Sequence, residues 1–192
     1  LDQAVACDDL MISEQVDAKD FDTAVTGSGR LWDDFEVGER LNHPAGMTVD
    51  DTDHTLATKL YQNNAKLHFD DLAMQDTAFG KRLMYGGHVI SVCRALSYDG
   101  LENALFIAAI NAGTHANPSF GGDTFYSWSE VLEKWPLPGR RDLGALRLRM
   151  VGLKNQRADS LASTHVDIDG KRQYHPNVVL DLDYTVLMPR QA

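Results

Sequence analysis

The sequence predicts an α+β fold in which an antiparallel sheet wraps around one central, buried helix. Residues 87–98 are apolar on nearly every side of a helix, which is typical of a helix enclosed by the rest of the protein. Four strand-like segments follow, and two of them alternate between apolar and charged residues. The 192 residues suffice for about one domain. An ordinary two-layer sandwich is the alternative, and the all-apolar helix favours the wrapped sheet.

The chain is expected to begin with a linker or an arm outside the folded domain. Residues 1–29 hold scattered apolar positions and many aspartates, and they end in a Gly- and Ser-containing stretch. We interpret them as a linker or an arm with room for one short helix, and residues 30–192 as the folded domain. The first strand is expected over residues 39–49, broken at Pro44, which cannot donate to a strand ladder.

Two helices are predicted before the central one. Residues 50–63 have helical spacing, and Asp50 is positioned to cap the first turn. A second, short helix is predicted over residues 71–78. The apolar face of the first helix is expected to consist of Leu56, Ala57, Leu60 and Tyr61.

The second half of the chain is expected to form strands. They are predicted at residues 105–112, 124–132, 145–151 and 178–187, with a polar, exposed excursion over residues 155–176. The last two strands alternate and therefore predict one apolar and one solvated face. If they are neighbours, their charged residues can pair across the strands: Arg147 and Arg149 with Asp181 and Asp183.

The composition excludes several classes of function. Eighteen Lys and Arg against 28 Asp and Glu give a net charge of −10, which argues against general nucleic-acid or membrane-surface binding. Two cysteines are too few for a disulfide framework, and a cytoplasmic location is the simplest interpretation. Neither a membrane-spanning run nor a signal peptide is visible. Because the chain begins with Leu1, we expect a fragment or a processed product.

No metal site, phosphate-binding loop or nucleophile motif is predicted. The seven histidines lack ligand spacing, and there is no cysteine pair to join them. No glycine-rich loop of the GxxxxGK[ST] type is present. Ser91 and Cys93 lie in the apolar helix without a nucleophile-elbow pattern.

The strongest local signal lies between residues 61 and 88, and it resembles the MaoC-like hotdog family of (R)-specific enoyl-CoA hydratases. The family pattern is an Asp, a His five residues later, then Phe-Gly, and a His-Gly that opens the central helix. Here Asn63 replaces the Asp, His68 matches the His, and Tyr85-Gly86 replaces the His-Gly, while Phe79-Gly80 matches directly. The likeness extends over about residues 30–188.

Within the family, several long stretches are most similar to the C-terminal half of the mesaconyl-CoA hydratases, also called β-methylmalyl-CoA dehydratases. They are LWDDFEVGE, LYQNNAKLHF, MYGGHVIS, AAINAG, NPSFGGDT and VVLDLDYTVLMPR. The resemblance implies a hydro-lyase that adds water reversibly to mesaconyl-CoA, with the CoA thioester as substrate and no cofactor. It also implies a double hotdog, so a second hotdog is expected as partner, either as a further copy or as a missing N-terminal half.

The resemblance assigns roles to four residues. His68 is the expected acid/base group, since imidazole exchanges protons near neutral pH. The amides of Gly86 and Gly87, at the start of a helix, are expected to stabilise the enolate oxygen. Asn63 is expected to orient water or imidazole, because an amide cannot accept the proton that an Asp would take. Packing of helix against sheet is the alternative role for both glycines.

Three further residues are candidates for binding substrate. Arg94 is the only charge in the apolar helix, where an unpaired charge is unfavourable, and it is a candidate partner for the free carboxylate of a diacid thioester. A protein carboxylate or the helix C-terminus is the alternative partner. Tyr85 either donates a hydrogen bond in the pocket or packs, and His88 is either a second acid/base group or a helix-start residue facing the partner.

Two other functions remain open. One is a hotdog acyl-CoA thioesterase, which calls for an acidic residue near the thioester. The other is a non-catalytic half that supports a partner's CoA site. Asn63, in place of the family's Asp, favours this alternative. The fold alone does not separate these functions.

Overall fold

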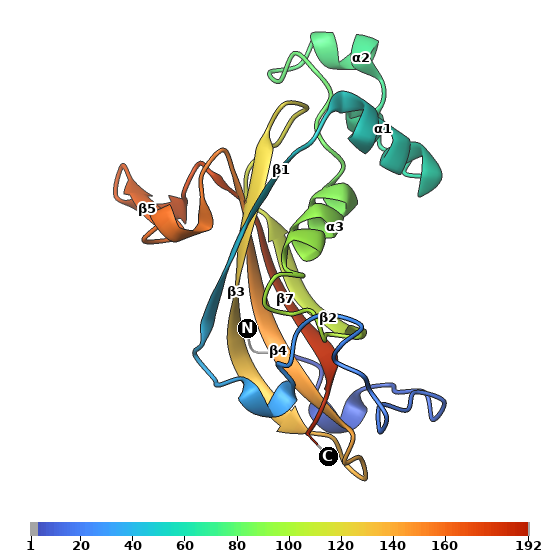
Figure 1. The fold of residues 1–192 in the computed structure, drawn as a ribbon. Coiled ribbons are helices and arrows are strands. Elements are labelled where there is room, and N and C mark those ends of the chain that lie inside the picture. Colours follow the sequence, from blue (N-terminus) through green and yellow to red (C-terminus); the bar gives the residue numbers. More distant parts are fainter. Residues whose placement is uncertain (1–3, 192) are drawn as a thin grey trace.

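The computed structural model describes residues 4–191 and contains a five-stranded antiparallel sheet (Figure 1). Its strands lie in the order β1 (Arg40–Thr48), β3 (Thr124–Pro136), β4 (Leu143–Lys154), β7 (Val178–Pro189) and β2 (Phe106–His115). The predicted strands are all present, most of them longer than expected. Because β7 lies between β4 and β2, the last strand of the chain occupies an interior position of the sheet.

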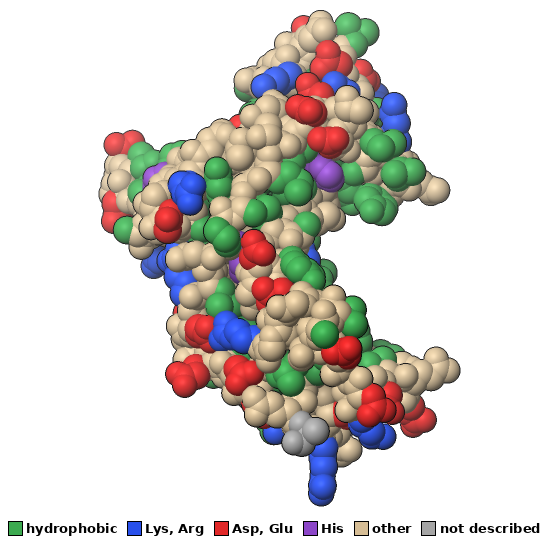
Figure 2. All heavy atoms as spheres, viewed as in Figure 1, with side chains coloured by type: hydrophobic (Ala, Val, Ile, Leu, Met, Phe, Trp, Pro, Cys, Tyr) green, Lys and Arg blue, Asp and Glu red, His purple; other side chains and the backbone are tan. Residues whose placement is uncertain are grey.

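The helix α3 (Gly86–Leu96) lies in the curve of this sheet, as predicted. Its buried side consists of Val89, Val92, Cys93 and Leu96. The prediction of a helix buried all round is wrong for this chain, since Ser91 and Ala95 are exposed. The sheet covers one side of α3 and leaves the other open, on the side where the molecule is hollowed (Figure 2).

The helix α1 (Asp51–Leu60) is capped by Asp50, as predicted, and Asp50 forms a capping box with Asp53. The apolar face predicted for α1 is largely wrong. The side chains that α1 buries are His54, Ala57 and Thr58. Leu56, Leu60 and Tyr61 of the expected face are instead exposed.

A 3₁₀ turn (Lys66–His68) and the short helix α2 (Asp71–Gln75) follow α1 and lead to α3. Strand β1 is interrupted as predicted around Pro44, because its register with β3 shifts between His43 and Met47. Further 3₁₀ turns lie at Cys7–Asp9, Trp32–Asp34 and Ala158–Ser160. Within residues 4–191, none of the helices is both long and apolar enough to cross a bilayer.

The outer face of the sheet, opposite α3, is covered at both ends. Leu10 and Ala18 of the N-terminal arm pack against Leu143 and Leu187 at one end. At the other end lies the segment between β4 and β7, which is largely polar and folds into the hairpin of β5 (His165–Ile168) and β6 (Lys171–Tyr174). The described part of the arm is therefore packed on the sheet.

The charged residues of β4 and β7 pair across the two strands, as the alternation predicts. Arg147 binds Asp183 with N–O distances of 2.6–3.1 Å, and Arg149 binds Asp181 at 2.7 and 2.9 Å. The expected solvated face is wrong, however, because only 7% of Arg147 and 2% of Asp183 are exposed. The second pair is less deeply buried, since the side chains of Arg149 and Asp181 are 28% and 14% exposed.

Candidate active site

A pocket of about 320 Å³ opens at the start of α3. Its walls come from three parts of the chain: the 3₁₀ turn that carries His68, the first turn of α3 with Gly86, and the end of β2 with His115. The remaining lining is mostly apolar, and it contains no Asp, Glu, Lys or Arg. A small apolar pocket with a few convergent polar groups is typical of a ligand site.

His68 is half-buried in this pocket and has a defined tautomer. Its Nδ1 lies 3.1 Å from the carbonyl oxygen of Leu83. A carbonyl only accepts, so Nδ1 is the donor in this contact, and in the neutral ring Nε2 then has the lone pair. The ring of Tyr85 meets that of His68 edge-on, with centroids 5.7 Å apart, and fixes its orientation further. The contacts of His68 with Leu83 and Tyr85 thus fix how its ring lies in the pocket.

His115 is a pocket residue that the sequence analysis missed. A Cβ at Gly86 would lie 2.5 Å from its Nε2, so the glycine is what allows the imidazole to rest on the start of α3. Burial, with a smaller contribution from His68, lowers the pKa of His115 and favours the neutral ring. His115 lies 29 positions beyond Gly86, so no local pattern links them; they meet because α3 lies in the curve of the sheet that contains β2.

Gly87 serves a similar purpose for Tyr85. A Cβ at Gly87 would lie 2.5 Å from the phenol of Tyr85, the residue that precedes the helix. Packing of helix against sheet, the alternative role for the two glycines, is thus present at Gly86, where His115 belongs to β2, whereas the neighbour of Gly87 is the residue that precedes the helix. The first amides of a helix have no partner within it, so the amides of Gly86 and Gly87 are also free to bind an oxygen atom.

Asn63 lies outside the lining of the pocket. Its Oδ1 accepts a hydrogen bond of 2.8 Å from the backbone amide of Ala65, within the turn that follows α1. This bond shapes the segment leading to His68, and it uses the oxygen that an acid/base Asp would present to substrate.

His88 and Arg94 also lie away from the lining residues. Nε2 of His88 is buried without a hydrogen-bond partner among the described residues, and burial lowers the pKa of its ring. Arg94 donates to Ser97 Oγ at 3.0 Å and to the carbonyl of Ala104 at 3.4 Å. It lies eight residues beyond Gly86, roughly 12 Å along the helix. The structure thus brings together His68, Tyr85, Gly86 and Gly87, and it separates Arg94 from them.

The part of the chain that the structure describes contains no group of three or more His, Cys, Asp or Glu side chains placed to hold a metal ion.

Comparison with known proteins identifies close relatives, although no family model matches the chain. The chain is 49% identical over 192 residues to a β-methylmalyl-CoA dehydratase from Chloroflexus aurantiacus and 48% identical over 189 residues to a mesaconyl-CoA hydratase from Cereibacter sphaeroides. These matches cover 100% and 97% of this chain, but only 53% and 52% of the relatives. The chain therefore spans about half the length of the curated relatives that it matches.

Solved structures give the same result. A crystal structure described as a putative MaoC domain protein dehydratase from Chloroflexus aurantiacus matches the whole chain with a TM-score of 0.90 and 49% identity, over 54% of its own length. A double-hotdog protein from Mycobacterium tuberculosis shares the fold, with a TM-score of 0.59 and 23% identity over 88% of this chain and 44% of its own. The chain is therefore similar over its whole length to a MaoC-domain dehydratase, as its motifs predict, and it has the hotdog fold.

Proposed function

We propose that this chain is part of a hydro-lyase that interconverts mesaconyl-CoA and β-methylmalyl-CoA. The observation that carries the proposal is His68, held on Leu83 with its free Nε2 in an apolar pocket at the start of α3. The substrate follows from the names of the two relatives, each about half identical to this chain.

In the proposed reaction, the thioester oxygen accepts hydrogen bonds from the amides of Gly86 and Gly87 at the start of α3. Nε2 of His68 takes a proton from water as the water oxygen attacks the β-carbon, and negative charge moves to the thioester oxygen. The protonated His68 then gives the same proton to the α-carbon. The elements of water are thereby added, and no cofactor takes part in the proposed steps.

The other site residues have supporting roles in this proposal. Tyr85 orients His68 through its ring, and Asn63 shapes the turn before it. His88, in the first turn of α3 but outside the pocket lining, has no assigned step; its ring is buried, and Asp53 and His54 lie close enough to affect its pKa. Arg94 has no part, because its guanidinium is bonded at the other end of α3. The proposed diacid preference therefore has no cationic residue in the pocket to explain it.

The two alternatives differ in how well they fit the pocket. A thioesterase that uses a carboxylate is disfavoured, since no Asp or Glu lines the pocket. A non-catalytic half is favoured by Asn63, whose side chain is bonded to backbone. We retain the non-catalytic half as the second candidate.

We further propose that the chain pairs with a second hotdog. Strand β2 is an edge of the sheet, and Ile107 and Ile110 on it are 36% and 59% exposed. An exposed apolar edge strand is a template for pairing with another strand. The twofold length of the relatives supports a partner of the same fold. A cytoplasmic location is proposed from the two free cysteines.

Loss of the enoyl-thioester absorbance tests the function. The chain is incubated with mesaconyl-CoA and, separately, with crotonyl-CoA. His68→Ala is expected to lower turnover at least ~100-fold, the contribution of a general acid/base, without changing the unfolding temperature. His165→Ala, in the β5–β6 hairpin, is the matched control and is expected to leave turnover unchanged. Absence of turnover in the unmodified chain, or equal turnover in His68→Ala, contradicts the proposal and favours the non-catalytic half.

A further inference from the structure

A second, larger pocket lies at the opposite end of the sheet from His68. Its volume is about 500 Å³, and it is formed by the arm, the β3–β4 turn and the residue that follows β7. In the register of β2 and β7, His115 pairs with Leu180, and Arg190 lies ten residues further along. At about 3.3 Å per residue, the two pockets are roughly 30 Å apart, so this one is separate from the candidate active site.

Basic residues gather in this pocket although the chain as a whole is acidic. Lys19, Arg140, Arg141 and Arg190 all line it, with Asp142 as the one acidic lining residue. The chain has 18 Lys and Arg against 28 Asp and Glu, so four cations around one cavity is an unusual concentration. Such a local excess attracts anions even when the net charge of the molecule is negative.

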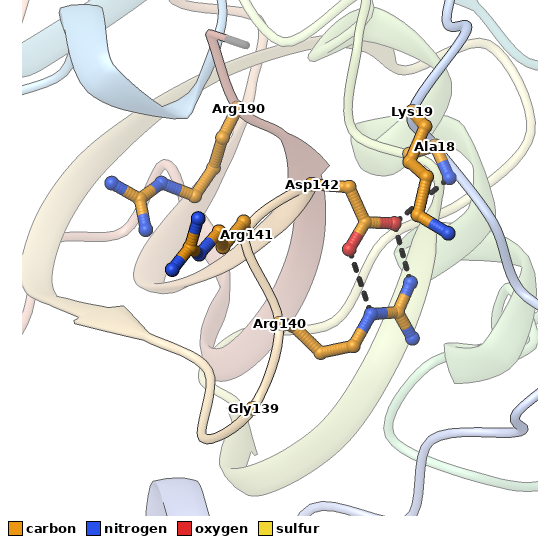
Figure 3. Close-up of a pocket in the computed structure, with 7 residues that line it drawn as sticks. All are labelled: Ala18, Lys19, Gly139, Arg140, Arg141, Asp142 and Arg190. Carbon is orange, nitrogen blue, oxygen red and sulfur yellow. Dashed lines mark hydrogen bonds and ion pairs between the residues drawn. The ribbon is translucent and has the colours of Figure 1, made fainter.

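One of the arginines is already neutralised. Arg140 donates to both oxygens of Asp142 at 2.7 and 2.6 Å, and the backbone amide of Ala18 donates to the same carboxylate at 3.0 Å (Figure 3). The Arg140 guanidinium holds the pKa of Asp142 well below its usual range. Asp142 is therefore fully occupied and does not offset the remaining cations.

The other two arginines lie side by side and are poorly compensated (Figure 3). Arg141 is exposed, and the described residues offer it neither an ion pair nor a hydrogen bond. Arg190 has a single acidic contact, 3.3 Å to Asp33, and its Nε is buried without a partner in the described chain. The ring of Trp32, 4.4 Å from its guanidinium carbon, holds Arg190 in place.

We propose that this pocket binds a phosphate group through hydrogen bonds from both Arg141 and Arg190, with Lys19 as a further cationic contact at the pocket edge. Two adjacent guanidinium groups repel each other unless an anion lies between them. A phosphate has enough oxygen acceptors to receive hydrogen bonds from both guanidinium groups. Lys19 pairs only weakly with Asp17, at 3.5 Å on an exposed surface, and is free to turn inward. The phosphate belongs either to the CoA substrate or to another phosphate compound.

Calorimetric titration of the 192-residue chain with inorganic pyrophosphate tests the site at constant ionic strength, because screening alone changes such affinities. Saturable one-to-one binding is expected. Arg141→Gln should weaken it at least about tenfold, the value of a charge-assisted hydrogen bond, and Lys19→Gln should weaken it less. Arg172→Gln is the matched control: it removes the same charge from an exposed position on β6 and should change the affinity less than about twofold.

Two results overturn the proposal: no saturable binding, or equal weakening by Arg141→Gln and Arg172→Gln, which would mean that only general charge attraction acts. Both variants alter exposed side chains, and an unchanged unfolding temperature verifies that they fold. Coenzyme A as competitor distinguishes the sources of the phosphate. Displacement of pyrophosphate identifies the substrate's own phosphates, and the absence of displacement identifies a separate phosphate ligand; both support the site. The His68→Ala variant is expected to bind pyrophosphate as the unmodified chain does, so this test does not depend on the proposed activity.

Discussion

At the scale of single residues, the contacts of two glycines and one arginine show which features of the site can be predicted from sequence. Gly86 and Gly87 leave room for the imidazole of His115 and the phenol of Tyr85, so each glycine is required by a particular ring. Motif reading found both glycines but only one of the two rings, because Tyr85 is their neighbour in sequence and His115 is not. Arg94 instead binds Ser97, the C-cap of α3, and the carbonyl of Ala104, in agreement with the helix C-terminus as its alternative partner.

Asp142 gives a pH-dependent prediction. Its side chain is 6% exposed, and its hydrogen bonds with Arg140 lower its pKa in the folded protein. A depressed folded pKa stabilises the protein above the unfolded pKa of about 3.9, and this stability is lost as the pH falls toward the folded value. Asp142→Asn should therefore reduce the free energy of unfolding by about 2 kcal/mol at pH 7.

At pH 3 the difference between the two proteins should shrink by about 1 kcal/mol, since the unfolded carboxyl binds a proton below about pH 3.9. Urea unfolding at both pH values measures it. A difference that stays the same at pH 7 and pH 3 would show that Asp142 does not titrate as argued. Asp17→Asn, at an exposed position nearby, serves as the control and should have little effect at either pH.

At the scale of elements, hydrophobic periodicity predicts every strand of the five-stranded sheet and the three α-helices. It does not predict correctly which faces of these elements are buried. The apolar pattern predicts that α3 is enclosed, yet Ser91 and Ala95 are exposed, because a pattern of apolar residues does not show whether the sheet surrounds the helix completely. On α1 the inward face holds His54 and Thr58, whose polarity hid them from a hydrophobic pattern. The face of β4 and β7 called solvated is flanked by the arm and the hairpin, whose positions depend on long-range packing.

The burial of α3 predicts the reactivity of the thiols. Cys93 is 0% exposed and packs close to Gly152, and burial raises its pKa to about 12. Cys7 is only partly buried. Because the thiolate is the reactive form, a disulfide reagent at pH 8 should modify one thiol per native chain and two in guanidinium chloride. Rapid modification of both in the native protein would mean that α3 leaves the sheet readily.

At the scale of the whole molecule, the open edge of the sheet predicts self-association. Ile110→Lys places a charge on β2, which natural sheets use to block pairing at an edge. Light scattering should show a mass above 21.3 kDa for the unmodified chain at micromolar concentration and a monomer for the variant. Met11→Lys, on an arm residue that is 92% exposed, should leave the mass unchanged. A monomer before any substitution would contradict the proposed pairing with a second copy.

The position of β7 sets the order in which the sheet can be assembled during synthesis. Strand β2 is synthesised before β3, β4 and β7, but among the described strands it pairs only with β7, which ends at Pro189. At ordinary translation rates β2 waits on the order of 10 s for its neighbour. Throughout that interval the apolar side of α3 also lacks part of its cover. The nascent chain thus leaves the apolar residues Ile107 and Ile110 of β2 without a paired strand until the end of β7 has been made, and unpaired strand edges of this kind favour aggregation.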